Sequence, residues 1–594
     1  MRLVINVFIL GVFVLLNTSF DLPHSNIWNY KVTNPLPSQT TQDTAFTLPQ
    51  NYFGSPLDIP LTLAGNFGEP RRLHFHTGLD FRTNQVEGHA VLAAAEGYIS
   101  RINVSGAGYG NALYVTHPNG YVTVYGHLQK FNPRIMQRLR KEQYTTESFA
   151  VDFDLLPYEI SIKKGDTIAL SGNSGGSGGP HLHFEIRDSL ERVYNPLLFG
   201  YRLKDAMKPI VSSLKFYPLD ELKYKSDGYR TKTYLKDGLY QLTSEIVKLN
   251  SSLVGISVNA HDVMNMTEAH TGIYNMTVFD GDRMIYEYKM DRISFTDRRD
   301  VLSHVDYPIF MNESRRAFHK CFTEPGNNAP VYCNLVNEGI VDLSDNKPHA
   351  IHIEISDYAG NVSLIKFKLQ KDKSSTLFKT KELKYTTRFD YTHENEFSNP
   401  DIKVKIPKGC LFDTVYFNYS STYSTEPNIL SKVHQLGNSN IQVVNWFDLS
   451  IRTENMNPAL NDKALVIFKD GAGGTTSRAG KFENGFIHTQ IREFGTYYVK
   501  VDTTVPQIKV LNVVTGRNMR SHKKILVKIT DNLSGISDFD TYIDEKWVLS
   551  DYDAKSATLT HTLNQNLSVG EHIFKVVVTD ERKNIAEHSV KFVM

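Results

Sequence analysis

The stretch Pro180-His-Leu-His-Phe-Glu-Ile-Arg187 predicts a β-strand with one chemical face and one apolar face. Side chains alternate across a strand with a period of two, so His181 and His183 point to the same side and the apolar residues between and after them to the other. A glycine-rich run from Gly172 to Gly179 precedes the strand. It leads into a strand rather than a helix and lacks the Lys-Ser/Thr of a P-loop, so it is not a phosphate-binding loop.

Two earlier clusters supply partners for this histidine pair. They are His74-Phe-His76-Thr-Gly-Leu-Asp80 and Val124-Tyr-Gly-His127-Leu128. The imidazole of His76, the carboxylate of Asp80 and one imidazole of the later pair form a three-ligand set that leaves a position for water, which is the catalytic pattern for zinc. His127 and the remaining histidine are then available to transfer protons. No HExxH motif occurs, so a thermolysin-type glutamate base is not offered.

Length and composition bound the class of protein. The chain has 594 residues, which predicts three to five domains, and 41% hydrophobic and 22% charged residues, as in an ordinary globular protein. A net charge of +1 gives no global attraction to nucleic acid. With three cysteines and no CxxC pair, a cysteine zinc site is excluded. Cys321 and Cys333 flank a loop and could form a disulfide in an oxidising compartment.

The N-terminus has the pattern of an export signal. Arg2 supplies a positive start, and Leu3 to Leu16 is almost wholly apolar but shorter than the roughly 20 residues of a membrane span. We therefore expect a signal peptide over residues 1–20 and a linker over residues 21–50, with an uncleaved N-terminal anchor as the alternative. Either way, the remainder is expected to be exported.

Residues 51–205 predict a compact antiparallel β domain, because short β-like runs are separated by glycine and helical periodicity is confined to Pro133–Gln143. The expected strands are Ala90–Ala95, Ala112–Thr116, Tyr121–Gly126, Thr167–Ser171 and His181–Arg187. The fold class expected for the whole chain is mainly β.

The rest of the chain contains an internal repeat. A strand ending in Asp262 and a later Asp357-Tyr-Ala-Gly-Asn361 correspond to a strand ending in Asp531 and a later Asp580-Glu-Arg-Lys-Asn584. This pattern predicts immunoglobulin-like β-sandwich modules at residues 206–375, with an insertion, and 504–594, separated by another β module at 376–503. The repeated aspartates either cap turns, which is the more common role, or bind calcium between modules.

The segment from about Ala64 to Asn195 resembles the LytM/lysostaphin-type peptidases of the M23 family. HxxxD, Tyr-x-His-Leu and Pro-His-Leu-His-Phe-Glu occur here in the family's order. The resemblance implies that His76, Asp80 and His183 hold Zn²⁺ and that His127 and His181 are catalytic. It also implies cleavage of peptides in peptidoglycan.

Some positions depart from the family or allow two roles. Residues Lys130 to Glu159 are inserted, and we expect a helix and loop at the rim of the groove. The tyrosine found near the metal in lysostaphin-like members is not placed by the sequence, and Arg71 or Arg72 could supply transition-state charge instead. Glu185 either orients a ligand histidine or is a solvated carboxylate. His117 precedes a turn and is expected at the surface.

The site pattern, the export signal and the family resemblance together predict an exported zinc metallo-endopeptidase, in the periplasm or cell envelope or secreted, and the resemblance implies that it acts on peptidoglycan peptides. No nucleic-acid partner is expected, and membrane contact is expected only through the signal or anchor. The alternative is a non-catalytic envelope protein that regulates wall hydrolases or binds wall peptides. The intact ligands and catalytic histidines favour the enzyme. A third possibility is an adhesion or assembly factor with an accessory peptidase domain.

Overall fold

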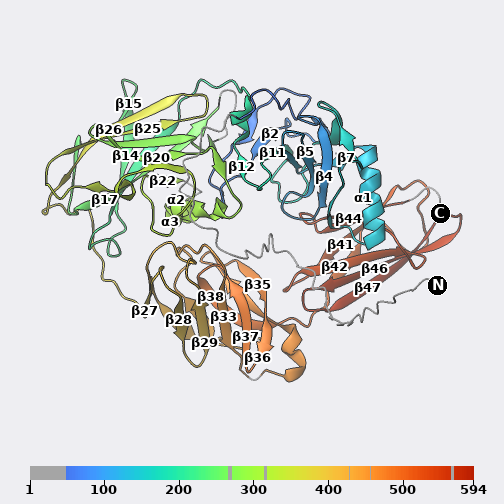
Figure 1. The fold of residues 1–594 in the computed structure, drawn as a ribbon. Coiled ribbons are helices and arrows are strands. Elements are labelled where there is room, and N and C mark those ends of the chain that lie inside the picture. The colour runs from blue at the N-terminus through green and yellow to red at the C-terminus, as the bar shows by residue number, and fades with distance from the viewer. Residues whose placement is uncertain (1–47, 265–269, 314–316, 427, 455, 564–566) are drawn as a thin grey trace, which may run out of the picture. The chain divides into compact units, whose positions relative to one another are not determined.

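The structure is a computed structural model, and it describes residues 48–264, 270–313, 317–426, 428–454, 456–563 and 567–594. The expected signal peptide and all but the last three residues of the expected linker lie outside these ranges. Within them, no helix has both the length and the apolar character needed to cross a bilayer. The fold is mainly β, as the sequence predicts, and its elements are shown in Figure 1.

The predicted peptidase segment is built on one large sheet with the path β1-β2-β11-β6-β5-β4-β8. Its strands are β1 (Leu63–Gly65), β2 (Leu79–Arg82), β4 (Gly97–Val104), β5 (Asn111–Thr116), β6 (Val122–Gly126), β8 (Val151–Asp154), β9 (Ser161–Ile162), β11 (His181–Arg187), β12 (Val193–Tyr194) and β21 (Arg292–Ile293). A smaller sheet contains β3 (Ala90–Leu92), β10 (Thr167–Leu170) and β7 (Lys130–Phe131). The five predicted strands are all present.

Strand β11 lies between β2 and β6, and its register brings the sequence clusters together. His183 is directly opposite Asp80 on β2 and Gly126 on β6. The apolar face of β11 packs inward, since Leu182 and Phe184 are fully buried. This packing fixes the register, because a slip by one residue would turn the histidines into the core.

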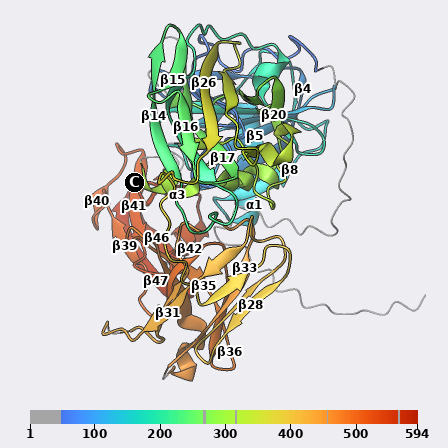
Figure 2. The same ribbon diagram turned by 90° about the vertical axis from the view of Figure 1, so that its left-hand side faces the viewer.

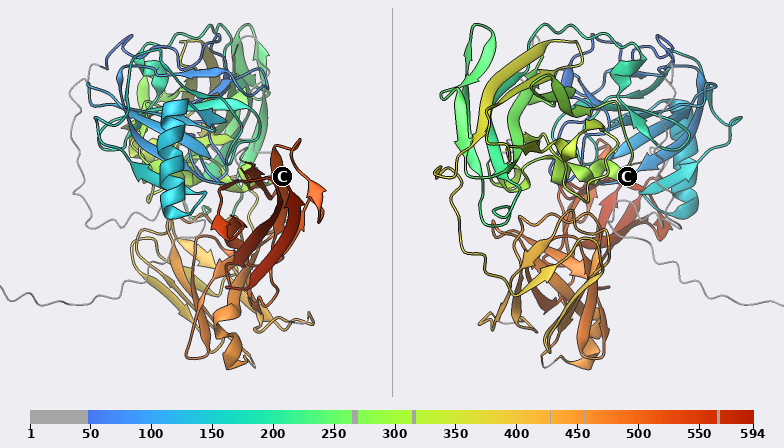
Figure 3. Two further views of the ribbon diagram at one scale, coloured as in Figure 1. Left: turned by 90° about the vertical axis from the view of Figure 1, so that its right-hand side faces the viewer. Right: turned by 60° about the vertical axis from the view of Figure 1, so that its left-hand side comes forward.

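The insertion contains the predicted helix, α1 (Pro133–Thr146). Asn132 caps it by accepting a hydrogen bond from the backbone N–H of Ile135, and Pro133 occupies the first turn, where its missing N–H costs nothing. Ile135, Leu139 and Gln143 form its buried face. Figure 3 shows α1 against the strands of the peptidase segment.

The peptidase sheet continues into the next segment, because β12 pairs with β21. One hydrophobic core runs through both. Figure 2 shows β14, β15 and β26 side by side. The second segment contains helices α2 (Val301–His304) and α3 (Tyr307–Asn312) and the strands β13 (Ile210–Pro218), β14 (Tyr229–Lys236), β15 (Leu239–Leu242), β16 (Ile246–Leu249), β17 (Leu253–Val263), β18 (His270–Thr271), β19 (Asn275–Asp280), β20 (Arg283–Lys289), β22 (Phe318–Lys320), β23 (Tyr332–Leu335), β24 (Val341–Asp342), β25 (His349–Ser356) and β26 (Val362–Lys371).

The third segment has its own hydrophobic core between two five-stranded sheets, and a further pair of strands adjoins them. The first sheet holds β28 (Asn395–Ser398), β29 (Ile402–Ile406), β33 (Phe447–Arg452), β36 (Lys481–Glu483) and β37 (Phe486–Ile491). The second holds β31 (Tyr419–Thr422), β32 (Val433–Leu436), β34 (Ala464–Lys469), β35 (Thr475–Ala479) and β38 (Gly495–Val501). The pair is β27 (Thr387–Phe389) with β30 (Val415–Phe417).

The last segment is a sandwich of a four-stranded and a five-stranded sheet around a separate core. Its strands are β39 (Gln507–Val510), β40 (Arg517–Asn518), β41 (Lys524–Thr530), β42 (Ile536–Ile543), β43 (Lys546–Trp547), β44 (Ser550–Asp553), β45 (Thr558–Thr562), β46 (Glu571–Asp580) and β47 (Ile585–Val593). The module boundaries given by the sequence stay predictions.

The suggested disulfide does not form in the structure. Cys321 and Cys333 are both free thiols, and so is Cys410. Cys321 is buried with its sulfur 3.7 Å from that of Met276, whereas Cys333 lies on the exposed side of the chain. The spacing along the chain suggested proximity, but Cys321 follows β22 and is buried, whereas Cys333 lies on β23 and is exposed.

Candidate metal centre

Three atoms from His76, Asp80 and His183 converge on one buried point. His76 Nε2 lies 3.1 Å from Asp80 Oδ1 and 3.2 Å from His183 Nδ1, and His183 Nδ1 lies 2.9 Å from the same carboxylate oxygen. The exposed fractions of the three residues are only 4–6%. Two come from β11 and β2 and are direct cross-strand partners, and the third comes from the turn before β2.

This triangle fits a metal ion. Bonds of about 2.0–2.1 Å in a tetrahedral arrangement place neighbouring ligand atoms about 3.3 Å apart, close to the separations found here. Two imidazoles and a carboxylate are also donors that suit a divalent transition metal. Three protein ligands leave one coordination position open, as in catalytic sites.

Hydrogen bonds on the far side of each ligand ring fix which nitrogen faces the centre. His76 Nδ1 lies 2.8 Å from the carbonyl oxygen of Asn66, which can only accept, so the ring donates there and Nε2 remains for a metal. His183 Nε2 lies 2.9 Å from Glu185 Oε1, which leaves Nδ1. These tautomers are assigned from the hydrogen-bond network.

The protonation of His183 depends on two carboxylates. Burial lowers its pKa, but hydrogen bonds to Asp80 and Glu185 outweigh burial and raise the pKa to about 9. Without a metal, the ring is therefore a cation that bridges the two carboxylates. A metal ion at this point would replace the proton on Nδ1, as expected when metal binding and proton release are coupled.

Glu185 is not the solvated carboxylate of the alternative prediction. Its side chain is fully buried, and Oε1 accepts hydrogen bonds from Thr77 Oγ1 at 2.6 Å and from the hydroxyl of Tyr109 at 2.6 Å, in addition to His183. Arg187, also buried, donates to Oε2. Burial raises the pKa of this carboxyl, but Arg187 and His183 outweigh burial and hold it well below its usual range. These contacts hold Glu185 in place behind His183 and support its role in orienting that ring.

Tyr109 is the residue that sequence reasoning missed. No sequence pattern places a tyrosine near the metal ligands, yet the ring centroid of Tyr109 lies 5.2 Å from that of His183. Its hydroxyl donates to Glu185, so it acts on the ligand through the carboxylate. The signal available was the Gly108-Tyr-Gly-Asn111 turn, where the tyrosine stands between two glycines with positive φ.

Arg71 contacts Asp80, one of the three residues of the candidate metal centre. Its Nη2 lies 2.9 Å from Asp80 Oδ2, the carboxylate oxygen that does not face the two imidazoles. This contact orients the carboxylate and holds Oδ1 toward the centre. Arg72 is exposed. Of the two arginines that the sequence offered, Arg71 is thus the one placed at the centre.

His127 and His181 lie beside the triangle formed by His76, Asp80 and His183, and their ring centroids are 4.7 Å apart. His127 Nδ1 lies 2.9 Å from the carbonyl oxygen of Ser174, and His181 Nδ1 lies 2.8 Å from that of Gly179, so each ring donates through Nδ1 and keeps Nε2 for another partner. His181 Nε2 is 3.4 Å from Asp80 Oδ1. Burial, followed by His183 and His181, lowers the pKa of His127 to about 3.

The backbone at His127 is unusual. It has φ of +59°, in the left-handed region that side chains other than glycine rarely adopt. The residue follows β6 directly, and its N–H donates to the carbonyl oxygen of Tyr109. Such strain is retained where surrounding contacts impose it, often at functional sites. The turn thereby directs the imidazole toward His181.

His117 contradicts its prediction as a surface turn residue. It is 3% exposed, and its two ring nitrogens contact the carbonyl oxygen of Glu96 and Oγ1 of Thr123, both at 2.8 Å. The turn after it is at the surface, but the ring packs inward against Phe53. Burial lowers its pKa to about 4. The sequence showed the turn and not the direction of the ring.

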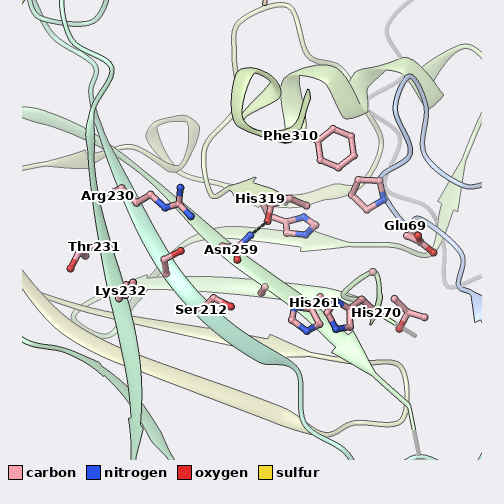
Figure 4. A pocket seen from close by; sticks show the side chains of 16 residues that line it. Glu69, Ser212, Arg230, Thr231, Lys232, Asn259, His261, His270, Phe310 and His319 are labelled. Carbon is pink, nitrogen blue, oxygen red and sulfur yellow. Dashed lines mark hydrogen bonds between the residues drawn. The ribbon is translucent and has the colours of Figure 1, made fainter. Parts of the chain in front are cut away.

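A second hollow is lined mainly by the segment that contains β17 and also by Glu69 and Pro70 of the peptidase segment. It encloses about 640 Å³, and Figure 4 shows Arg230, Lys232 and Asn259 around it. His261 and His270 stack on one another there, with ring centroids 3.9 Å apart. It brings together no carboxylate-and-imidazole triad of the kind formed by His76, Asp80 and His183 among the residues that the structure describes.

The fold and the buried triad together define a metallopeptidase-type domain, and comparison with known proteins agrees. Residues 74–149 match Peptidase family M23, and residues 386–502 match the Zu5-like domain. One part of the chain is thus similar to M23-family peptidase domains, and a later part is similar to Zu5-like domains. The family implies a metal, and the M23 match itself includes His76, Asp80 and His127.

Three relatives illustrate the similarity. An uncharacterized metalloprotease of Haemophilus influenzae is 31% identical over 25% of this chain and 28% of its own length. The DD-carboxypeptidase/endopeptidase Mpg of Neisseria meningitidis is 34% identical over 20% and 22%. The peptidoglycan DD-endopeptidase ShyC of Vibrio cholerae is 30% identical over 23% and 26%. The match thus spans only about a quarter of the length of these relatives.

Proposed function

We propose that this chain is an exported zinc metallo-endopeptidase that hydrolyses peptide bonds in peptidoglycan. The observation that carries the proposal is the convergence of His76 Nε2, Asp80 Oδ1 and His183 Nδ1 within 3.2 Å of one another. These three residues would hold Zn²⁺. The contacts with Asn66 and Glu185 support this assignment, because each occupies the far nitrogen of its ring and leaves His76 Nε2 or His183 Nδ1 for the metal.

Zinc, when bound, supplies Lewis acidity for the attack of water on a peptide carbonyl. The chain's own residues must then accept the proton that water loses and return it to the leaving amine. We assign this work to His127 and His181. His127 is neutral at physiological pH, since its pKa is about 3, and Nε2 can accept a proton. His181 offers Nε2 beside Asp80.

The substrate class and the location rest on other support. The names of two similar proteins, a DD-carboxypeptidase/endopeptidase and a peptidoglycan DD-endopeptidase, favour a cell-wall peptide. The apolar stretch Leu3 to Leu16 favours export to the periplasm or envelope, where that substrate lies. The β modules after the peptidase segment would position it there.

The test compares the chain lacking residues 1–20 with its His183→Ala variant. Bound zinc is measured by elemental mass spectrometry, and products released from purified peptidoglycan are identified by mass spectrometry. We expect the variant to lose both the metal and the products. His89→Ala, a partly exposed histidine in the same segment, is the matched control and should retain both. Absence of zinc, or equal activity in His183→Ala, would overturn the proposal.

A further inference from the structure

Two clusters of aspartates recur at equivalent places in the internal repeat. In the first, Asp205 precedes β13, Asp262 stands near the end of β17 and Asp357 follows β25. In the second, Asp502 precedes β39, Asp531 follows β41 and Asp580 ends β46. Each cluster thus joins the linker before a sandwich to two strand ends of that sandwich.

Each cluster brings three carboxylates close together. One oxygen from each aspartate lies within 4.8 Å of the others. Two aspartates of each cluster are deeply buried, since Asp262 and Asp357 are 4% and 3% exposed and Asp502 and Asp580 are each 1% exposed. The third aspartate of each cluster is half-buried. Like charges at such separations repel strongly where water is excluded. The arrangement requires something positive to stabilise it.

In the part of the chain that the structure describes, no basic side chain supplies that positive charge. Among the described residues, no Lys, Arg or His side chain forms an ion pair with any of the six carboxylates. Lys463 comes near the second cluster, but it donates to the amide oxygen of Asn584.

A buried oxygen in each cluster has no hydrogen-bond partner, and it belongs to the same repeat position. These atoms are Asp262 Oδ1 and Asp531 Oδ1. Turn capping accounts for the other oxygen of Asp531, which accepts from the N–H groups of Leu533 and Gly535. It does not account for Oδ1. A buried carboxylate oxygen left unpaired is unfavourable, so its repetition at the same position of both repeats points to a ligand.

The surrounding hydrogen bonds tie each cluster to its linker. Asn361 Nδ2 donates to Asp357 Oδ2 at 2.7 Å and to the backbone oxygen of Asp205 at 3.4 Å. Asn584 Nδ2 donates in the same way to Asp580 Oδ2 at 2.7 Å and to the backbone oxygen of Asp502 at 3.0 Å. An ion held by the carboxylates would therefore also fix the linker against the sandwich that follows.

We propose that each cluster binds one divalent cation, Ca²⁺, and that this ion fastens the linker to the following β-sandwich. Oxygen-only donors select hard cations, and carboxylates drawn from three separate segments give the irregular geometry that Ca²⁺ tolerates and Mg²⁺ does not. The affinity expected for such modules is on the order of 0.1–1 mM. The proposal does not depend on the peptidase activity.

Calcium binding is measured on the chain lacking residues 1–20 after treatment with EGTA, by equilibrium dialysis against ⁴⁵Ca²⁺ up to 5 mM, about five times the upper end of the expected affinity range. We expect one ion per cluster for the two clusters. Asp262→Asn and Asp531→Asn should each lose one ion, and the double variant both. Asp282→Asn, an exposed aspartate on the same segment as Asp262, should lose none.

Circular dichroism shows whether the variants fold, and if Asp262→Asn does not, Asp205→Asn at the half-buried linker position replaces it. The thermal midpoint of the parent chain should rise with added Ca²⁺, and the rise should be smaller in each single variant. No bound calcium, or binding that the variants leave unchanged, overturns the proposal. Tighter binding of Mg²⁺ than of Ca²⁺ overturns the choice of ion.

Discussion

Glu185 Oε1 accepts a hydrogen bond from His183 Nε2 at 2.9 Å, and the two residues stand on the same face of β11. This contact turns the other nitrogen of His183 toward Asp80 and His76. Glu185 therefore orients a metal-ligand residue although it is not one of the three residues whose atoms converge.

Replacing Glu185 by Gln should weaken zinc binding by about 10–100-fold, the usual effect of removing a carboxylate behind a ligand histidine. The amide keeps one acceptor oxygen but loses the charge that matches Arg187. Competition with a chromophoric chelator measures the affinity. Glu191→Gln removes an exposed partner of the same arginine and should leave zinc affinity unchanged. Equal affinity in Glu185→Gln and the parent would contradict the role given to Glu185.

Gly78 should not tolerate a side chain. A Cβ atom there would lie 2.6 Å from the carbonyl oxygen of Phe184 and 2.7 Å from Cε1 of His183. Gly78→Ala must therefore displace a metal-ligand residue or the strand that carries it, and a shift near 1 Å costs about 100-fold in rate. Gly178→Ala, in a loop where a Cβ would meet nothing within 4 Å, is the control. Zinc content and turnover of both variants test this, and a fully active Gly78→Ala would refute it.

His127→Ala should keep its zinc and lose turnover. The ring is not one of the three that converge, so the metal stays, while loss of a proton-transfer group costs about 10²–10⁴-fold in kcat. The measurement is kcat on a peptidoglycan peptide together with metal content. A parallel loss of zinc would show that His127 is instead a metal ligand.

His117 should make the fold sensitive to acid. Folding lowers its pKa from 6.5 to about 4, so the unfolded chain binds more protons between these values. Its contribution is complete above about pH 6.5, falls as the pH drops toward 4, and amounts to at most about 3 kcal/mol.

The thermal midpoint from pH 7 to 4, by scanning calorimetry, tests this sensitivity. His117→Gln should flatten the fall in the midpoint across that window. His588→Gln, at an exposed position, should leave it as steep as in the parent. If the slopes of the parent and His117→Gln coincide, the burial of His117 does not govern the acid response.

Part of the centre could be predicted because its pattern is local. Alternation along residues 181–187 places the two histidines and Glu185 on one face whatever the rest of the chain does. The helix of the insertion was also predictable, since Asn132 and Pro133 start it and its apolar spacing continues it. The choice of His183 over His181 as a metal-ligand residue came from family resemblance, and it stays a prediction with geometric support.

Other residues could not be assigned from local pattern. Tyr109 and Arg71 reach the centre only because β5, β6, β11 and β2 lie in that order in the sheet. The turn that follows His117 lies at the surface, as the sequence predicts. The ring of His117 instead packs inward on Phe53, which the turn pattern does not predict. Cys321 and Cys333 are near in sequence and apart in environment.

By itself the sequence determined the residue types of the centre, their order along the chain, the β character of the segments and the repeat that carries the aspartates. The tertiary structure alone decided the register that sets His183 opposite Asp80, the burial of Glu185, and the meeting of Asp205, Asp262 and Asp357. The reason is physical. Alternation and turn preference act over a few residues, whereas strand pairing brings together residues more than a hundred positions apart, and only the packing of the whole core selects one pairing.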